Sequence, residues 1–363
     1  MKKGFVRNST GLIMLSLFVL LLTACGAAEE SSGEDGDADQ DEQESMDLVF
    51  SHFQPANHPI QTEVLDGLDE DLNEQTDGRI NMEFYADNTL GDPESHYDMT
   101  VSGEADIGLS VYGYAPGSFD LVTVMELPFL AESAEHASEI LMTLYEEFPE
   151  LQEEHDDTHP LFLYSAEPAQ IMSNDYRIET PEDIEGLRVR SPSPLANDII
   201  ESMGATAVSM PMGDVYEALD RGVIDAAMVP LETLYNYSFH EVVEYITIGN
   251  FSATPFFSVM NQNTYDGIGD SDQEVLDSLT GKELATEAGS VYDEDGEAGL
   301  DAAIDSGAEI IELEGDTLEP WEEALEPVVG SWLEERESEG YDATELYERA
   351  MELRDELSGD GEE

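Results

Sequence analysis

Residues 181–230 read PEDIEGLRVRSPSPLANDIIESMGATAVSMPMGDVYEALDRGVIDAAMVP, and short apolar runs alternate in them with helical patterns. A helix start is marked by Thr180 as N-cap, Pro181 at the first helical position and two acids in the first turn. Strands are predicted near 187–190, 205–208 and 223–228, and helices over 194–203 and 212–221. This β-α-β-α-β order predicts a parallel or mixed sheet with helices on its faces.

Two arginines, Arg188 and Arg190, share one apolar run and point to the same face of a regular strand. The chain has 12 Lys and Arg against 85 Asp and Glu, so cations in a half-buried strand are unusual here. Arginine binds a carboxylate through two parallel hydrogen bonds, which makes this strand a candidate anion site. Arg190 is the stronger candidate because a Ser-Pro-Ser-Pro turn follows it, whose N–H groups and hydroxyls, including Ser193, could join the guanidinium. The alternative for both arginines is pairing with the abundant surface carboxylates.

The block from Glu182 to Pro230 resembles the solute-binding proteins of TRAP (tripartite ATP-independent periplasmic) transporters, often called C4-dicarboxylate-binding. The family's G-L-K-hydrophobic-R-x-P run reads Gly186 to Pro192 here, and its E-V-Y-x-A-L and G-x-hydrophobic-D-G runs read 214–219 and 222–226. Further similar segments lie at 76–80, 88–91, 126–129, 261–265 and 320–322, so the resemblance covers roughly residues 47–355. It implies an α/β, two-lobed periplasmic-binding-protein-like fold with mixed sheets flanked by helices and a long lobe-connecting helix.

The resemblance also implies roles for single residues. The arginine that forms a two-pronged salt bridge to the ligand carboxylate falls on Arg190, and the group that packs on the ligand falls on Met212. Val229, beside Met228, stands where the family often has asparagine. Many sialic-acid binders have a second arginine where Glu167 to Gln170 stand here.

These departures favour a less polar carboxylate, aromatic or branched, over a sialic acid. The side chains expected to contact it are apolar or aromatic, and core packing is the alternative for each: Met212, Met228, Phe53 and Tyr112 or Tyr114.

The N-terminus has the features of a targeting segment. Residues 1–24 carry Lys2, Lys3 and Arg7 before an apolar run, which predicts a signal peptide. Leu22-Thr23-Ala24-Cys25 resembles the bacterial lipobox, which implies lipidation at Cys25; an ordinary secretory signal is the alternative. Cys25 is the one cysteine of the chain, so a monomer has no disulfide. Residues 25–45 are acidic and lack large apolar side chains, which predicts a disordered tether.

The remaining residues are numerous enough for two cores. We expect 46–167 to form mainly the first lobe and 168–260 mainly the second. Residues 261–363 are expected to supply C-terminal helices and a strand that return across both lobes.

The formal net charge is −73, and a chain without a basic face is not a nucleic-acid binder. So acidic a composition indicates adaptation to high salt, where screening weakens self-repulsion; an alkaliphile is the alternative. His155 and His159 are four apart but lie in a polar stretch before Pro160, so no metal site is expected. The sequence contains neither a cofactor-binding fingerprint nor an arrangement of nucleophile and base, so we do not expect an enzyme.

The sequence therefore predicts an extracytoplasmic solute-binding lipoprotein on the cell membrane. It would capture a small organic acid, close around it and deliver it to the TRAP permease subunits that the resemblance implies. A ligand-binding sensor that feeds a signalling partner is the alternative.

Overall fold

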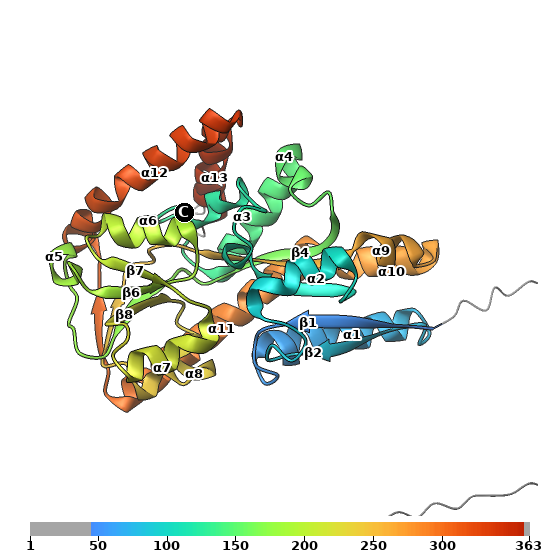
Figure 1. Ribbon diagram of the computed structural model, residues 1–363, viewed down its shortest axis with the longest axis horizontal. Coiled ribbons are helices and arrows are strands. Elements are labelled where there is room, and N and C mark those ends of the chain that lie inside the picture. The colour runs from blue at the N-terminus through green and yellow to red at the C-terminus, as the bar shows by residue number, and fades with distance from the viewer. Residues whose placement is uncertain (1–44, 359–363) are drawn as a thin grey trace, which may run out of the picture. The chain divides into compact units, whose positions relative to one another are not determined.

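The structure is a computed structural model that describes residues 45–358 (Figure 1). Two mixed sheets, each flanked by helices, form two lobes, as predicted. The first lobe is built on the sheet β2-β1-β3-β10-β4 and the second on the sheet β11-β9-β5-β8-β6-β7. The predicted signal peptide, Cys25 and nearly all of the predicted tether lie outside the described residues.

The first sheet combines parallel and antiparallel strands. Strand β1 pairs in parallel with β2 and β3, and β10 lies antiparallel between β3 and β4. The strands are β1 (Met46–His52), β2 (Ile80–Tyr85), β3 (Ile107–Val111), β4 (Thr158–Ala166) and β10 (Thr254–Asn261).

Strand β10 corrects the predicted boundary of the second lobe. Residues 254–260 were assigned to that lobe, but they form a central strand of the first sheet. Seven of the eight β10 residues are buried, as expected for a strand covered on both faces. Burial of nearly the whole strand is compatible with a central place in either sheet, so it does not indicate which sheet the strand joins.

Helices cover both faces of the first sheet. A helical stretch over residues 60–75 begins with η1, which is wound as a π-helix, and continues as α1. The helical elements of this lobe are η1 (Ile60–Leu65), α1 (Asp66–Gln75), η2 (Pro93–Ser95), α2 (His96–Ser102), η3 (Tyr112–Tyr114), η4 (Val122–Glu126), α3 (Ala134–Glu147), α4 (Pro149–Glu153), α9 (Gln262–Gly267) and α10 (Asp270–Leu279).

The second sheet contains the β-α-β-α-β unit that the sequence predicted. Strand β6 pairs in parallel with β7 and β8, while β5 is antiparallel to β8 and β9. Figure 1 shows α6 on one side of these strands and α7 and α8 on the other. The strands are β5 (Gln170–Ser173), β6 (Arg188–Ser191), β7 (Thr206–Ser209), β8 (Ala226–Val229), β9 (Tyr245–Ile248) and β11 (Glu309–Glu312).

Side chains cap two helix starts of this lobe, and the one at Thr180 was predicted. Thr180 and Asp183 form a capping box at α5, and the Ser193 hydroxyl accepts a hydrogen bond from the Ala196 N–H at the start of α6. The helical elements are α5 (Pro181–Ile184), α6 (Pro194–Ser202), η5 (Met212–Asp214), α7 (Val215–Asp220), α8 (Thr233–Asn236), η6 (Phe239–Glu241) and η7 (Gly315–Thr317).

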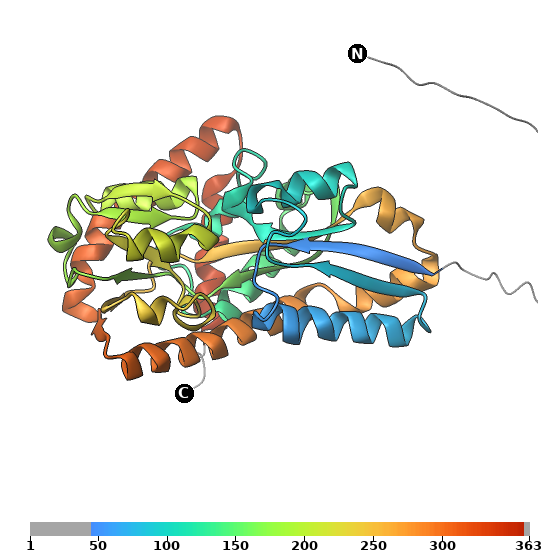
Figure 2. The same ribbon diagram turned by 60° about the horizontal axis from the view of Figure 1, so that its bottom comes forward.

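The predicted lobe-connecting helix is α11 (Lys282–Ser306), which packs on α3 and β4 of the first lobe and on α8 of the second. Figure 2 shows this long orange helix running along one side of both lobes. Two glycines permit its close approach. A Cβ atom at Gly289 would lie 2.6 Å from the Cα of Glu135, and one at Gly299 would lie 2.4 Å from the Leu231 carbonyl oxygen.

The last two helices also bridge the lobes, since α12 (Glu319–Glu339) packs on α6 and α13 (Ala343–Leu357) packs on α3. Gly340, with φ +105°, ends α12. A proline inside a helix normally breaks or kinks it, but α12 continues through Pro327, because Trp321 and Trp332 bury its inner face on both sides of the proline.

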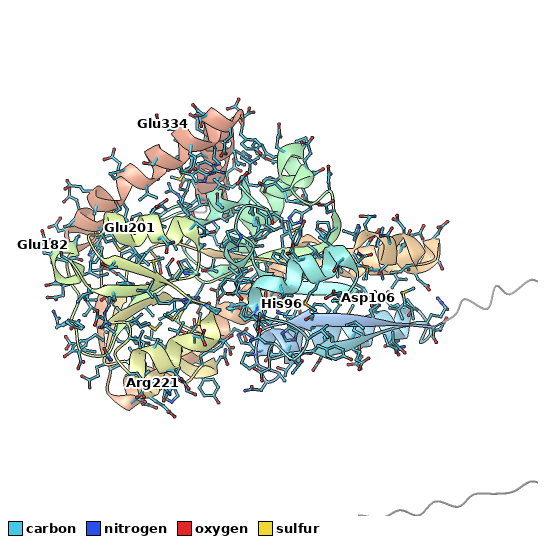
Figure 3. The ribbon with its side chains drawn as sticks, viewed as in Figure 1. His96, Asp106, Glu182, Glu201, Arg221 and Glu334 are labelled. Carbon is cyan, nitrogen blue, oxygen red and sulfur yellow. The ribbon has the colours of Figure 1, made fainter. Side chains whose placement is uncertain are left out.

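Within residues 45–358, none of the helices combines the length and the apolar character that a membrane span requires. Their outer faces are acidic. Figure 3 shows Glu182 and Glu334 on the outside of α5 and α12.

Candidate ligand-binding site

Arg190 is the centre of the candidate site. It lies in β6 with 1% of its surface exposed. Its Nε donates to the Met210 carbonyl at 3.1 Å, Nη1 to the Met228 carbonyl at 3.3 Å, and Nη2 to the Tyr114 hydroxyl at 3.0 Å. Burial lowers the pKa of Arg190, while the Tyr114 hydroxyl opposes that effect.

All three of these acceptors are neutral. Within the described part of the chain, no carboxylate oxygen lies within 4.0 Å of the Arg190 guanidinium. A guanidinium has five N–H groups, so one on Nη1 and one on Nη2 remain available to a carboxylate. Arg188 differs, because its side chain is 44% exposed and forms an ion pair with Asp225 at 2.7 Å. Surface pairing therefore describes Arg188 and not Arg190.

Arg190 contributes to a small cavity between the two lobes. Its volume is about 20 Å³, which is enough for a water molecule but too little for an organic acid. The lobes must therefore separate to admit one. The lining residues come from both lobes and from α11: Phe53, Val111, Tyr114, Ala166, Arg190, Pro192, Met212, Pro230, Glu232, Tyr237, Thr254, Phe256 and Tyr292.

Aromatic rings form most of one wall. Phe53 stacks on Phe256 with ring centroids 6.1 Å apart and an interplanar angle of 13°, and Tyr114 meets Phe53 edge-on at 5.6 Å. Tyr292, from α11, lies 5.9 Å from Phe256. Flat apolar surfaces beside a guanidinium suit a planar acid.

Two of the predicted contact residues, Phe53 and Met212, line this cavity together with Arg190. Met228 is buried in β8, where its carbonyl group accepts from Arg190, and Val229 is fully buried in the same strand.

The other two predicted residues lie close by but do not line the cavity. The Ser193 hydroxyl caps α6 and bonds Glu126, while the neighbouring Pro192 forms part of the wall. Tyr112 packs in the core of the first lobe, where its hydroxyl lies 2.9 Å from His155 Nε2. Tyr114 is the tyrosine that reaches Arg190, and its hydroxyl also accepts from the Met212 N–H at 3.0 Å.

The prediction did not include Glu232, Tyr237, Phe256 and Tyr292. Phe256 and Tyr292 belong to β10 and α11, far along the chain from β6, and no local pattern connects them to Arg190. The acidic Glu232 gave no signal in a chain with 85 acids.

Glu126 and Ser193 join the lobes beside the cavity, through a hydrogen bond from the Ser193 hydroxyl to the Glu126 carboxyl group. Burial raises the pKa of Glu126 to about 7, and the Ser193 hydrogen bond opposes that effect. The backbones approach closely here, since a Cβ atom at Gly113 would lie 2.5 Å from the Ser193 Cβ.

Glu167, which stands near the position of the sialic-acid binders' second arginine, is 5% exposed. Its Oε1 accepts from the Glu232 N–H at 2.7 Å. Burial, and next the charge of Glu232, raise the pKa of Glu167 well above its ordinary value. Among residues 45–358, no group of three or more His, Cys, Asp or Glu side chains is arranged to hold a metal ion.

The family model described as "Bacterial extracellular solute-binding protein, family 7" matches residues 50–335. The chain belongs to this family. Its function is therefore the binding of a solute outside the cytoplasm, as predicted. Among curated relatives, it is 24% identical over 241 residues to the 2,3-diketo-L-gulonate-binding periplasmic protein YiaO of Escherichia coli. The aligned residues cover 66% of this chain and 73% of that protein.

Solved structures confirm the similarity to TRAP solute-binding proteins. One comes from an unidentified marine microbe, is specific for aromatic acid ligands and was crystallised with 3-hydroxybenzoate. Its sequence is 28% identical and its TM-score is 0.83, and the match covers 87% of this chain and 99% of that chain. Another, from Rhodoferax ferrireducens with copurified benzoate, is 25% identical with a TM-score of 0.82, over 86% and 98% of the two chains.

Proposed function

We propose that this family member captures an aromatic carboxylic acid between its lobes and delivers it to a TRAP membrane permease. The observation that carries the proposal is Arg190, a buried guanidinium with two spare N–H groups and no acidic partner among the described residues, beside a wall of aromatic rings. The similar structures that hold benzoate and 3-hydroxybenzoate support the aromatic class.

In the proposed mechanism, the acid enters while the lobes are apart and its carboxylate takes the two spare N–H groups of Arg190. Closure brings Phe53 and Tyr114 of the first lobe onto the ring and excludes water. The pair between carboxylate and guanidinium strengthens as water leaves, because the local dielectric falls. The permease would then recognise the closed form, in which the two lobes present one continuous surface.

The role of Arg190 is tested by titration calorimetry with benzoate, phenylacetate, succinate and a sialic acid. The buffer contains about 2 M NaCl, which screens the charge of the protein. We expect the aromatic acids to bind. The Arg190→Lys substitution should lower their affinity by roughly 10- to 100-fold, because an ammonium cannot reproduce the two-pronged contact.

Arg188→Lys is the matched control, since Arg188 lies two residues away but pairs with Asp225 at the surface. It is expected to leave affinity within about twofold. Equal affinity of the Arg190→Lys variant and the wild type would remove the two-pronged role.

We also propose that Cys25 carries the lipid that anchors the protein to the outer face of the cell membrane. The lipobox-like run before it supports this proposal. Cys25→Ser is expected to move the protein from the membrane fraction to the soluble fraction and to remove the acyl mass in intact-protein mass spectrometry, without changing ligand affinity. A variant that stays in the membrane fraction would contradict the anchor.

A further inference from the structure

Glu232 is the one acid among the residues that line the cavity of Arg190. It follows β8 and directly precedes α8, and its side chain is 3% exposed. An acid buried beside the proposed binding place of an anion is unexpected, because like charges repel and each desolvated charge requires partners.

One of the two Glu232 oxygens has partners. Its Oε2 accepts from the Asn236 Nδ2 at 2.9 Å and lies 3.4 Å from His58 Nε2. The His58 Nδ1 accepts from the Ile60 N–H at 3.2 Å, so the ring proton is on Nε2, the atom that faces Glu232.

The other oxygen is different. Within residues 45–358, no hydrogen bond to Glu232 Oε1 is formed, although the side chain lines the cavity. A carboxylate has about four acceptor positions, so this oxygen has capacity for a donor. Closure around a ligand without a donor would leave it desolvated and unsatisfied, which is costly for a charged group.

The neighbouring acid, Glu167, contacts the backbone of Glu232 and not its side-chain oxygens. Glu167 binds the Glu232 N–H through its Oε1, and its own pKa is raised well above the ordinary value by burial and by Glu232. The cavity lining thus contains one guanidinium, that of Arg190, and one carboxyl group, that of Glu232, which are not paired with each other.

We propose that Glu232 selects aromatic acids that carry an O–H or N–H donor on the side of the ring remote from the carboxylate. Arg190 binds the carboxylate, the aromatic wall covers the ring, and Glu232 Oε1 accepts from the remote donor. The two opposite charges also fix the direction of the ligand, because a carboxylate placed at Glu232 is repelled. This inference rests on the proposed function.

The test compares phenylacetate with 3-hydroxyphenylacetate, and adds 3-(aminomethyl)benzoate to distinguish a hydroxyl donor from an ammonium donor. The readout is the ratio of dissociation constants, measured by calorimetry on the purified protein in high salt. We expect the wild type to bind at least one donor-bearing acid about tenfold more tightly than phenylacetate. In Glu232→Leu, which offers no acceptor, the ratio should fall below about twofold.

Glu232→Gln provides a second test in case the Glu232→Leu variant does not fold. The amide keeps the shape and an acceptor oxygen but loses the charge, so the preference should fall by about threefold or more, since hydrogen bonds to charged groups are roughly twice as strong. Asp295→Asn is the matched control. Asp295 accepts from Asn236 at 2.8 Å but does not line the cavity, so its loss should leave the ratio unchanged.

A wild type that binds all three acids within twofold, or a ratio that persists in Glu232→Gln, would overturn the role of Glu232. A third outcome is possible: aromatic acids bind and Arg190→Lys lowers their affinity, but the ratio of dissociation constants in the wild type stays near one. The proposed function then stands and this inference fails. If no aromatic acid binds, both fail.

Discussion

Arg190 and Arg188 show how two like residues in one strand acquire different chemistry. The sequence singled out both, and the turn after Arg190 favoured it as the anion site; in the structure Arg190 is buried, while Arg188 pairs with Asp225 at the surface. The tyrosines were harder to assign. In a continued strand, Tyr112 and Tyr114 would point to the same face. The strand ends at Val111, however, and the tight turn η3 sends Tyr112 into the core and Tyr114 to Arg190.

Glu126 gives a pH dependence of stability at a single residue. Because its pKa rises from 4.5 to about 7, the folded protein keeps a proton that the unfolded chain releases in this window. The free energy of unfolding therefore falls as pH rises from about 4.5 to 7. Above pH 7 the whole contribution of Glu126, on the order of 3 kcal/mol, has been lost.

Glu126→Gln keeps an acceptor for Ser193 and removes the titration, so its free energy of unfolding should change less between pH 5 and pH 8. Urea unfolding at constant salt measures the difference. Glu201→Gln, an exposed acid on α6, is the control and should behave like the wild type. The same pH slope in the wild type and in Glu126→Gln would show that Glu126 ionises freely in the folded protein.

Among the elements, local signals predicted the helices and strands of residues 181–230 well, because caps and glycines mark each boundary. They did less well where distant packing decides. Pro327 removes one hydrogen bond from α12, yet the buried face of that helix keeps it continuous. Strand β10 was not predicted as a strand, and its neighbours β3 and β4 come from residues about 100 to 150 positions earlier.

Helix α11 depends on a glycine for its position between the lobes. Gly289→Ala is expected to destabilise the protein by roughly 1–3 kcal/mol, because the new methyl group meets the backbone of α3 at 2.6 Å, which outweighs a gain in helix propensity of about 1 kcal/mol. Gly330→Ala in α12 is the matched control, with nothing within 4 Å of its Cβ position, and should stabilise. Thermal unfolding in high salt measures both; an unchanged or raised Tm for Gly289→Ala would contradict this packing.

At the level of the whole molecule, charge sets the conditions under which the site works. Without residues 1–24, which hold three of the 12 cations, nine Lys and Arg remain against 85 acids. The screening length falls from about 10 Å at 0.1 M salt to about 3 Å at 1 M, so repulsion between surface acids weakens steeply over this range. Repulsion of an anionic ligand weakens with it, whereas the buried site of Arg190 is screened much less.

We therefore expect Tm to rise with NaCl between 0.1 and 1 M and then to level off, and carboxylate affinity to rise over the same interval. Differential scanning calorimetry and ligand titration measure the two trends. Sodium sulfate at equal ionic strength distinguishes the cause: screening predicts curves that coincide with those in NaCl, whereas exclusion of salt from the protein surface predicts a larger effect of sulfate. Binding that weakens as salt rises would mean that the field at Arg190 attracts anions from solution, and the acidic surface would then have no part in ligand capture.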